Sequence, residues 1–264
     1  ICSCPTLPDL AEPDDELVKA IEAMLYDVWR SKGMPAGLIN KEVTTMVAEL
    51  LWKDVLDSYG KDIIALDWDT PDFKMLESLQ KNVWHFSSAK NYTQLRELSS
   101  ALIAPDGKLR TESQFFDEAF KINNRHIKQH LRAERELAIA GSQEAGKWVS
   151  IQEDKDIFPY IAFDVVMDLH TSEICKPLAG VVVPVDHPYV KIYYPPNHFG
   201  CRTTTRKLRS GKVTTNLPYP EIPKMFQTNL GEQGLIFPPG HAYFDGLPDD
   251  VISAANKLIP KLSK

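Results

Sequence analysis

Two histidines and two cysteines in the second half of the chain are of the types that bind a metal ion. They are His170, Cys175, His198 and Cys201. Zinc prefers imidazole nitrogens and thiolate sulfurs, and the spacing His-x-x-Cys at 198 and 201 is typical of a zinc knuckle. The chain has no pair of C-x-x-C motifs, which would be the stronger signal. Zinc is therefore one interpretation; the other is that no cofactor binds and both cysteines are small buried hydrophobic residues.

The same side chains raise the alternative of an enzyme, because nucleophilic catalysis needs a cysteine or serine beside a base. A Cys/His-dependent hydrolase would place Cys201 within hydrogen-bond reach of a histidine in an open cleft. A metal-dependent nuclease is the second enzymatic alternative. The sequence contains no nucleophile elbow, papain-type context, phosphate-binding loop or dinucleotide fingerprint. We therefore expect no catalytic residue and no enzymatic activity.

The segment YYPPNHFGCRTTT, residues 193–205, also has the composition of a rigid structural loop. Prolines restrict the backbone to extended conformations, asparagine and glycine accept a positive φ, and a phenylalanine can anchor the loop in the core. The residues expected to act in this way are Pro195, Pro196, Asn197, Phe199 and Gly200. We expect Arg202 to bind Asp168 through two parallel hydrogen bonds. This interpretation predicts a braced loop that performs no chemistry.

Basic side chains are concentrated in and just after this segment, although the whole chain has a net charge of −6. The residues that would bind a nucleic acid or another anionic partner are Arg202, Arg206, Lys207, Arg209 and Lys212. Glu221 is the one acid between Arg202 and Lys224. This asymmetry predicts a local contact with an anion such as DNA, and the alternative is a solvated face balanced by acids from elsewhere.

The composition is that of a globular protein, with 43% hydrophobic and 25% charged residues among 264. No apolar run approaches the roughly 20 residues that span a bilayer, so no membrane partner is expected. Four cysteines are too few for a disulfide scaffold, which predicts a reducing, intracellular setting. Cys2 and Cys4 are expected in a frayed, accessible terminus. Because the chain does not begin with Met, the numbering can start inside a longer product, and a removed leader stays open.

The elements that must position these residues change character along the chain. Apolar residues at helical spacing predict five helices in the first part, at 16–30, 41–59, from Pro71 onward, 88–102 and 111–148. The last of these should bury Phe116, Phe120, Ile127, Leu131 and Leu137.

The remaining part is rich in β-branched residues and proline. Strands are predicted in 158–168 and 180–196, and a final helix at 249–262. We therefore predict an α+β fold with a helical N-terminal region, 1–110, followed by a compact, loop-rich domain with short strands, 111–264.

An ordered series of motifs in residues 85–208 resembles the phage head morphogenesis domain of the phage Mu F-like minor head proteins. The segments that carry it are AERELAIAGSQEAGKW and FPYIAFDVVMDLHTSEICKPLAGVVVPVDHPYVKIYYPPNHFGCRTTT. The matching positions are Trp148, Asp168, Cys175, Leu178, Gly180, Pro184, Asp186, Pro188, Pro195, Pro196, Cys201 and Arg202. Two positions depart from the family pattern: Thr203 replaces the second cysteine of Cys-Arg-Cys, and Ala179 replaces the aspartate of Leu-Asp-Gly.

The resemblance implies a minor capsid protein that acts in head morphogenesis. Its implied partners are the portal protein and other capsid components, with the packaged viral DNA as a further contact. Its implied location is the virion, in the capsid interior or near the portal, and the cytoplasm of the bacterial host during assembly. The N-terminal helices and the tail are similar to longer versions from phages and prophages of Bacteroidetes-type bacteria. Some relatives carry toxin or nuclease domains, which keeps an effector of prophage-toxin type as the alternative.

Overall fold

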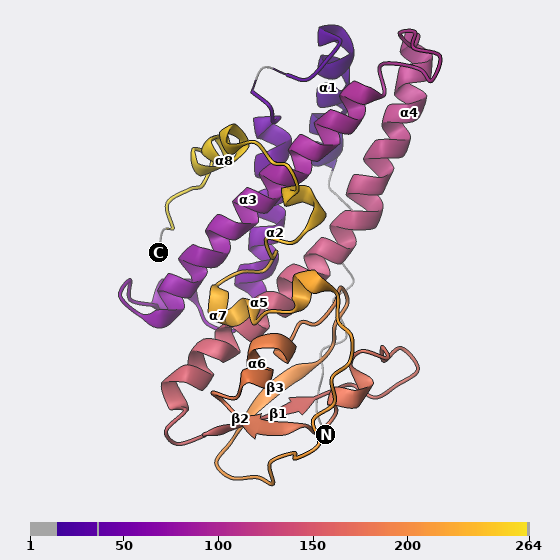
Figure 1. Cartoon of the computed structure of the whole chain (residues 1–264). Coiled ribbons are helices and arrows are strands. Elements are labelled where there is room, and N and C mark those ends of the chain that lie inside the picture. The colour runs from indigo at the N-terminus through magenta and orange to yellow at the C-terminus, as the bar shows by residue number, and fades with distance from the viewer. Residues whose placement is uncertain (1–14, 36, 263–264) are drawn as a thin grey trace.

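The computed structural model describes residues 15–35 and 37–262, and it confirms an α+β fold with a helical N-terminal half (Figure 1). Cys2 and Cys4 lie outside the described residues. The first two helices are α1, Asp15–Ser31, and α2, Lys41–Ser58, close to the predicted bounds. The side chain of Asn40 accepts a hydrogen bond from the Val43 amide at 3.0 Å and so caps the start of α2.

One long helix, α3, Pro71–Ser100, replaces the two helices that were predicted from Pro71 and at 88–102. Thr70 caps its start, and Pro71 occupies the first helical position, as predicted. The prediction of a break was wrong because no glycine or proline lies inside this segment. Polar residues in its middle, such as Ser88 and Asn91, are buried against neighbouring helices. The polar residues in this part of the sequence therefore mark contacts between helices and not a loop.

The predicted helix at 111–148 is longer and contains a π-helical turn. It consists of α4, Glu112–Asn124, the π turn η2, Arg125–His130, and α5, Leu131–Asp154. A capping box between Thr111 and Gln114 begins α4. Four of the five residues predicted to be buried are at least partly so; the prediction was wrong for Phe120, whose side chain is 48% exposed.

A three-stranded antiparallel sheet follows, in the order β2-β1-β3. Its strands are β1, Tyr160–Asp164, β2, Val182–Pro184, and β3, Thr204–Leu208. The strand predicted over 180–196 is confirmed only for its first part, because Pro188 begins the short helix α6, Pro188–Tyr193, with His187 as its cap. Strand β3 lies in the basic stretch, where no strand was predicted.

The C-terminal segments return to the helices (Figure 1). They comprise α7, Leu230–Gln233, and α8, Asp249–Asn256, which is shorter than the helix predicted to end at 262. Pro260 disfavours helical backbone at the residue before it, which accounts for the earlier end. Four short 3-10 turns complete the described elements: η1, Ile63–Ala65, η3, Lys176–Leu178, η4, Lys224–Phe226, and η5, Ala242–Phe244.

Asn82, in the middle of α3, binds the C-terminal segment at Ile236 and Phe237. Its Oδ1 accepts hydrogen bonds from the amides of Ile236 and Phe237, at 2.9 and 2.8 Å, and its Nδ2 donates to the Phe237 carbonyl. Phe237 also stacks on Phe86, with ring centroids 3.6 Å apart. The larger hydrophobic core therefore combines helices α1 to α5 with residues 226–243.

A smaller core lies between α6, the sheet and the second half of α5. Because α5 contributes to both cores, it connects the helical half to the sheet. No helix in the described part of the chain combines the length and the apolar character needed to cross a bilayer.

Candidate functional site

The pairing of β1 with β3 brings the two cysteine-bearing loops together. The last pair of this ladder joins Asp164 to Thr204, at the end of one strand and the start of the other. The loop that leaves β1 carries Cys175, and the loop that enters β3 carries Cys201. Because the strands are antiparallel, both loops must lie at the same edge of the sheet.

Three of the four predicted metal ligands form a compact cluster at this edge. The ligating atoms of Cys175, His198 and Cys201 all lie within 4.8 Å of one another. The two sulfurs are 3.7 Å apart, and Cys175 Sγ is 3.2 Å from His198 Nε2. Both cysteines are free thiols with little exposure, 3% for Cys175 and 7% for Cys201. The fourth predicted ligand, His170, lines the adjacent cavity but does not belong to this group.

Local turns hold the three side chains in place. The hydroxyl of Ser172 accepts a hydrogen bond from the Cys175 amide at 3.1 Å and lies 2.8 Å from His198 Nε2. His198 and Cys201 are the ends of a turn in which the Cys201 amide donates to the His198 carbonyl. Gly200 has φ +69° in this turn, as the sequence predicted, and a side chain there would be strained.

The ionisation of the cluster follows from its contacts. The hydrogen bond with Cys201 and the contacts with His198 and Ser172 lower the pKa of Cys175 to about 4, against the effect of burial. The contact with Cys175 and burial raise the pKa of Cys201 well above its ordinary value. The Cys175 contact also raises the pKa of His198. These shifts favour the thiolate form of Cys175, the protonated ring of His198 and the neutral thiol of Cys201.

The space beside the cluster is small. A cavity of about 10 Å³, room for the centre of one water molecule, is lined by Cys175, His198, His170, Thr203 and their neighbours. A thiol and a histidine are in contact, as nucleophilic catalysis requires; they are Cys175 and His198, one of the pairings that the sequence allows. A peptide or nucleotide does not fit into this volume, so the geometry does not favour a hydrolase or a nuclease.

The predicted brace between Arg202 and Asp168 is present. Arg202 Nη1 and Nη2 donate to the two carboxylate oxygens at 2.7 and 2.6 Å. The Arg202 guanidinium and the amide of His170 lower the pKa of Asp168. Thr171 closes the turn by donating to the Val166 carbonyl and accepting from the Asp168 amide. The loop 166–171 is thus held in one shape from within and by Arg202, which lies just before β3.

The remaining motif positions are structural. Trp148 packs edge-on against Tyr194, with ring centroids 5.0 Å apart, and Leu178 is fully buried. Gly180 has φ +73°, which favours glycine. Asp186 is exposed and lies 3.5 Å from Lys155. The bond between Pro195 and Pro196 is a cis peptide bond.

Two expectations for the loop were wrong. Phe199 is not buried in the core: it is 38% exposed and meets the buried ring of Phe226 and the ring of His241 edge-on. Asn197 does not have a positive φ among the described residues. It is instead completely buried, and neither side-chain amide atom has a hydrogen-bond partner.

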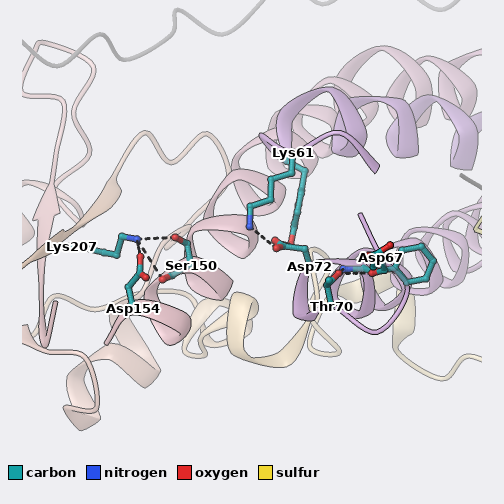
Figure 2. Close-up of polar contacts among 9 residues, drawn as sticks. Lys61, Asp67, Thr70, Asp72, Ser150, Asp154 and Lys207 are labelled. Carbon is teal, nitrogen blue, oxygen red and sulfur yellow. Dashed lines mark hydrogen bonds and ion pairs between the residues drawn. The ribbon is translucent and has the colours of Figure 1, made fainter. Parts of the chain in front are cut away.

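Three of the five predicted anion-binding residues form ion pairs within the chain. Besides Arg202, Arg206 pairs with Asp164 at 2.9 Å, and Lys207 pairs with Asp154. Figure 2 shows Lys207 reaching both Asp154 and Ser150, and on the other side of the view Lys61 bound to Asp72 at the start of α3. Arg209 lies over the ring of Phe158, and Lys212 is exposed. The acids of α5 and β1 thus balance much of the basic stretch.

Ser172 and Thr203 also belong to the surroundings of the cluster, and neither was predicted to do so from the sequence. The Thr203 hydroxyl is buried, lines the small cavity and has no oxygen or nitrogen hydrogen-bond partner. Serine and threonine are common in loops, so only the position of Thr203 two residues after Cys201 could have pointed to it.

Comparison with known proteins places this site in a family context. Residues 116–206 match the family model described as Phage Mu protein F like protein. The match begins in α4 and ends in β3, so it contains the whole Cys175–His198–Cys201 cluster and the brace of loop 166–171. No curated protein and no solved structure matches the chain.

Proposed function

We propose that this chain, whose residues 116–206 match the phage Mu protein F like family, is a minor head protein that docks onto the portal protein during head assembly. The match confirms the resemblance seen in the sequence motifs and supports a role in phage head morphogenesis. The portal as direct partner, and a location in the virion near it, are the finer parts of this proposal.

The observation that carries the docking proposal is the braced loop 166–171. It exposes two apolar side chains, Leu169 at 101% and Met167 at 61%. Apolar side chains presented on a pre-shaped loop gain binding free energy at low entropic cost, because little order remains to be imposed on association. The bidentate pair of Arg202 and Asp168 supplies that order. The geometry therefore supports a protein-binding loop.

A protein partner is better supported than DNA. Non-specific DNA binding scales with the number of phosphates that basic side chains neutralise. Arg202, Arg206 and Lys207 already bind carboxylates of the same chain. Contact with packaged DNA through this stretch remains a secondary part of the proposal, carried by Arg209 and Lys212. An enzymatic role is less well supported, because the cavity at the thiol is so small.

The docking proposal predicts that Met167→Asp/Leu169→Asp abolishes capture of the protein by the portal protein of the same phage. A charge on each apolar contact would have to be desolvated at the interface, which is costly. Leu109→Asp is the matched control, because Leu109 is also exposed, at 52%, but lies between α3 and α4. Copurification of the portal protein with each variant measures the effect.

Mass spectrometry of purified particles tests the wider role. The protein should be present in the particles in few copies, and the double variant should be absent from them. Full incorporation of the double variant would exclude loop 166–171 as the docking surface. Absence of the wild-type protein from both particles and assembly intermediates would contradict a head protein altogether.

A further inference from the structure

We propose that Cys175, His198 and Cys201 bind one Zn²⁺ ion, with a water molecule in the fourth position, and that this ion staples the loops on either side of the β1–β3 pair. This site is structural and does not depend on which head component the protein contacts.

The spacing of the ligand atoms is that of a tetrahedral zinc site. Two thiolates bound at about 2.3 Å in tetrahedral geometry have sulfurs about 3.8 Å apart, and a thiolate and an imidazole nitrogen lie about 3.6 Å apart. The observed distances are 3.7 Å between Cys175 and Cys201 and 3.2 Å between Cys175 and His198. An ion between them would require only small side-chain shifts.

The orientation of His198 is the second observation. Its Nδ1 lies 2.6 Å from the Phe199 carbonyl, a contact in which the ring nitrogen must donate. Nε2, the other ring nitrogen, faces Cys175. A metal-binding histidine commonly donates its remaining N–H to a backbone carbonyl, which fixes the ring and directs the other nitrogen to the metal.

The fourth position has both space and a polar neighbour. The small cavity beside Cys175 and His198 holds about one water molecule. The hydroxyl of Thr203, which lines it and is 6% exposed, has no oxygen or nitrogen partner. A metal-bound water at this position would supply that partner. The Thr203 hydroxyl, which also contacts the Cys175 sulfur, is therefore placed to hold a metal-bound water.

Two competing arrangements define the test. The sulfurs are 3.7 Å apart, whereas a disulfide requires about 2.05 Å, so oxidation would need both side chains to move. Alternatively, Ser172, at 2.8 Å from His198 Nε2, and the two thiols form a hydrogen-bonded cluster without metal. Zinc would replace the Ser172 contact with Nε2.

Metal content of the purified full-length chain is the primary experiment. The protein is incubated with Zn²⁺, dialysed against a weak chelator and analysed by plasma mass spectrometry. We expect one zinc per chain in the wild type, in Ser172→Ala and in Cys2→Ser/Cys4→Ser. Cys175→Ser, Cys201→Ser and His198→Ala should each weaken binding by more than the roughly 10- to 100-fold typical of losing an outer-shell partner.

Titration with Co²⁺ identifies the ligands without relying on zinc content. Thiolate-bound tetrahedral cobalt has intense visible and near-ultraviolet bands, and we expect these to saturate at one equivalent. Thr203→Cys should bind more tightly and raise the sulfur-to-cobalt band by about half, because a third thiolate replaces the water. Ser210→Cys, which adds a cysteine at an exposed position two residues after β3, should leave the spectrum unchanged.

Thiol alkylation of the wild type covers the case in which a ligand variant fails to fold. Zn²⁺ should protect Cys175 and Cys201 from iodoacetamide at least tenfold relative to chelator-treated protein, while Cys2 and Cys4 react equally in both samples. Less than a quarter of an equivalent of metal together with no protection would overturn the proposal. A Cys175–Cys201 disulfide that forms in air from zinc-loaded protein would also overturn it.

Discussion

Gly146 shows how closely α5 approaches the end of α2. A Cβ atom added at this position would lie 2.7 Å from the carbonyl oxygen of Tyr59, and backbone cannot move aside as a flexible side chain can. Tyr59 is itself held by its hydroxyl, which donates to Asp72 at 2.9 Å. The absence of a side chain at 146 is therefore a condition for packing α5 on the α2–α3 connection.

Gly146→Ala should destabilise the protein by about 1–3 kcal/mol, the usual range for overpacking. Without the clash, alanine would stabilise the helix by roughly 1 kcal/mol relative to glycine. A loss of stability in Gly146→Ala would therefore show that the clash outweighs helix propensity. Gly141→Ala is the matched control in the same helix, since its nearest neighbour is the Ile236 side chain at an ordinary 3.4 Å. Urea unfolding followed by circular dichroism should show Gly141→Ala neutral or stabilised; equal losses in both variants would contradict this assignment.

At the scale of single residues, the sequence predicted contacts between complementary side chains better than it predicted surroundings. The Arg202–Asp168 pair and the positive φ of Gly200 were predicted because charge and backbone freedom belong to the residue itself. The exposure of Phe199 and the burial of Asn197 were not predicted, because both depend on neighbours from distant segments of the chain. The partners of Cys175 could be narrowed to a few histidines and cysteines and no further.

At the scale of elements, the π turn η2 creates a buried polar junction between α3 and α5. Lys90 Nζ, in α3, donates to the His126 carbonyl at 2.8 Å and pairs with Glu134 of α5, and both side chains are almost inaccessible to solvent. Burial lowers the pKa of Lys90 and raises that of Glu134, while their contact opposes both shifts. The extra residue of the π turn thus provides a carbonyl for the ammonium group.

Lys90→Met should destabilise the protein by about 3–5 kcal/mol, because Glu134 would be left buried without its partner. Lys90→Met/Glu134→Met should recover at least half of that loss, since two apolar side chains replace two buried charges. Chemical denaturation of the wild type, both single variants and the double variant measures the coupling. A double variant less stable than either single variant would show that the pair does not act as a unit.

His241 makes the adjoining C-terminal segment sensitive to acid. Burial, with Lys90 and His130 nearby, lowers the pKa of His241 to about 4, although Asp245 opposes this. The ring packs against Phe86 and Tyr243, and Nδ1 accepts a hydrogen bond from the Tyr243 amide, which a protonated ring could not do. The unfolded chain binds this proton near pH 6.5 and the folded chain only near pH 4, so stability must fall as the pH decreases between these values.

As the pH is lowered from 6.5 to 4, protonation linked to His241 should decrease the free energy of unfolding by at most about 3 kcal/mol. Below pH 4 this contribution should level off. In His241→Asn, which keeps a cap acceptor that does not titrate, the free energy of unfolding should change less over this interval. His187→Asn exchanges the same kind of cap in α6 and serves as the control. Denaturation midpoints at several pH values test this; an unchanged slope in His241→Asn would exclude His241 as the acid-sensitive group.

Element prediction was most accurate where local signals were strong. The starts of α2 and α3 were predicted at the observed residues, from the apolar spacing after Lys41 and from Pro71. The unbroken course of α3 and the helix α6 were missed, because buried polar residues and β-branched residues are decided by tertiary contacts.

At the scale of the whole molecule, α5 belongs to two cores and joins them rigidly. Its first half binds α2 through Arg135, which makes two hydrogen bonds to Asp54, at 2.7 and 2.9 Å. Its second half carries Trp148 and Ile151 into the core beneath the sheet. We therefore expect the full-length chain to unfold in a single transition, with equal calorimetric and van't Hoff enthalpies.

Differential scanning calorimetry tests this expectation. Disrupting the helical half with Lys90→Met should destabilise the sheet, followed by amide hydrogen exchange in β1 and β3, as much as it destabilises the helices. Two separate transitions would instead show that the regions before and after residue 110 unfold independently, as separate domains would.

The return of residues 226–243 to the helices also has a consequence for synthesis. Phe86 and Asn82 leave the ribosome about 150 residues before Phe237. Phe237 stacks on the ring of Phe86 and hydrogen-bonds with Asn82. Part of the apolar surface of helices α1 to α5 must therefore stay uncovered until residue 237 has been synthesised and has folded back. During that interval a chaperone or a neighbouring nascent chain can occupy the place that the tail will later take.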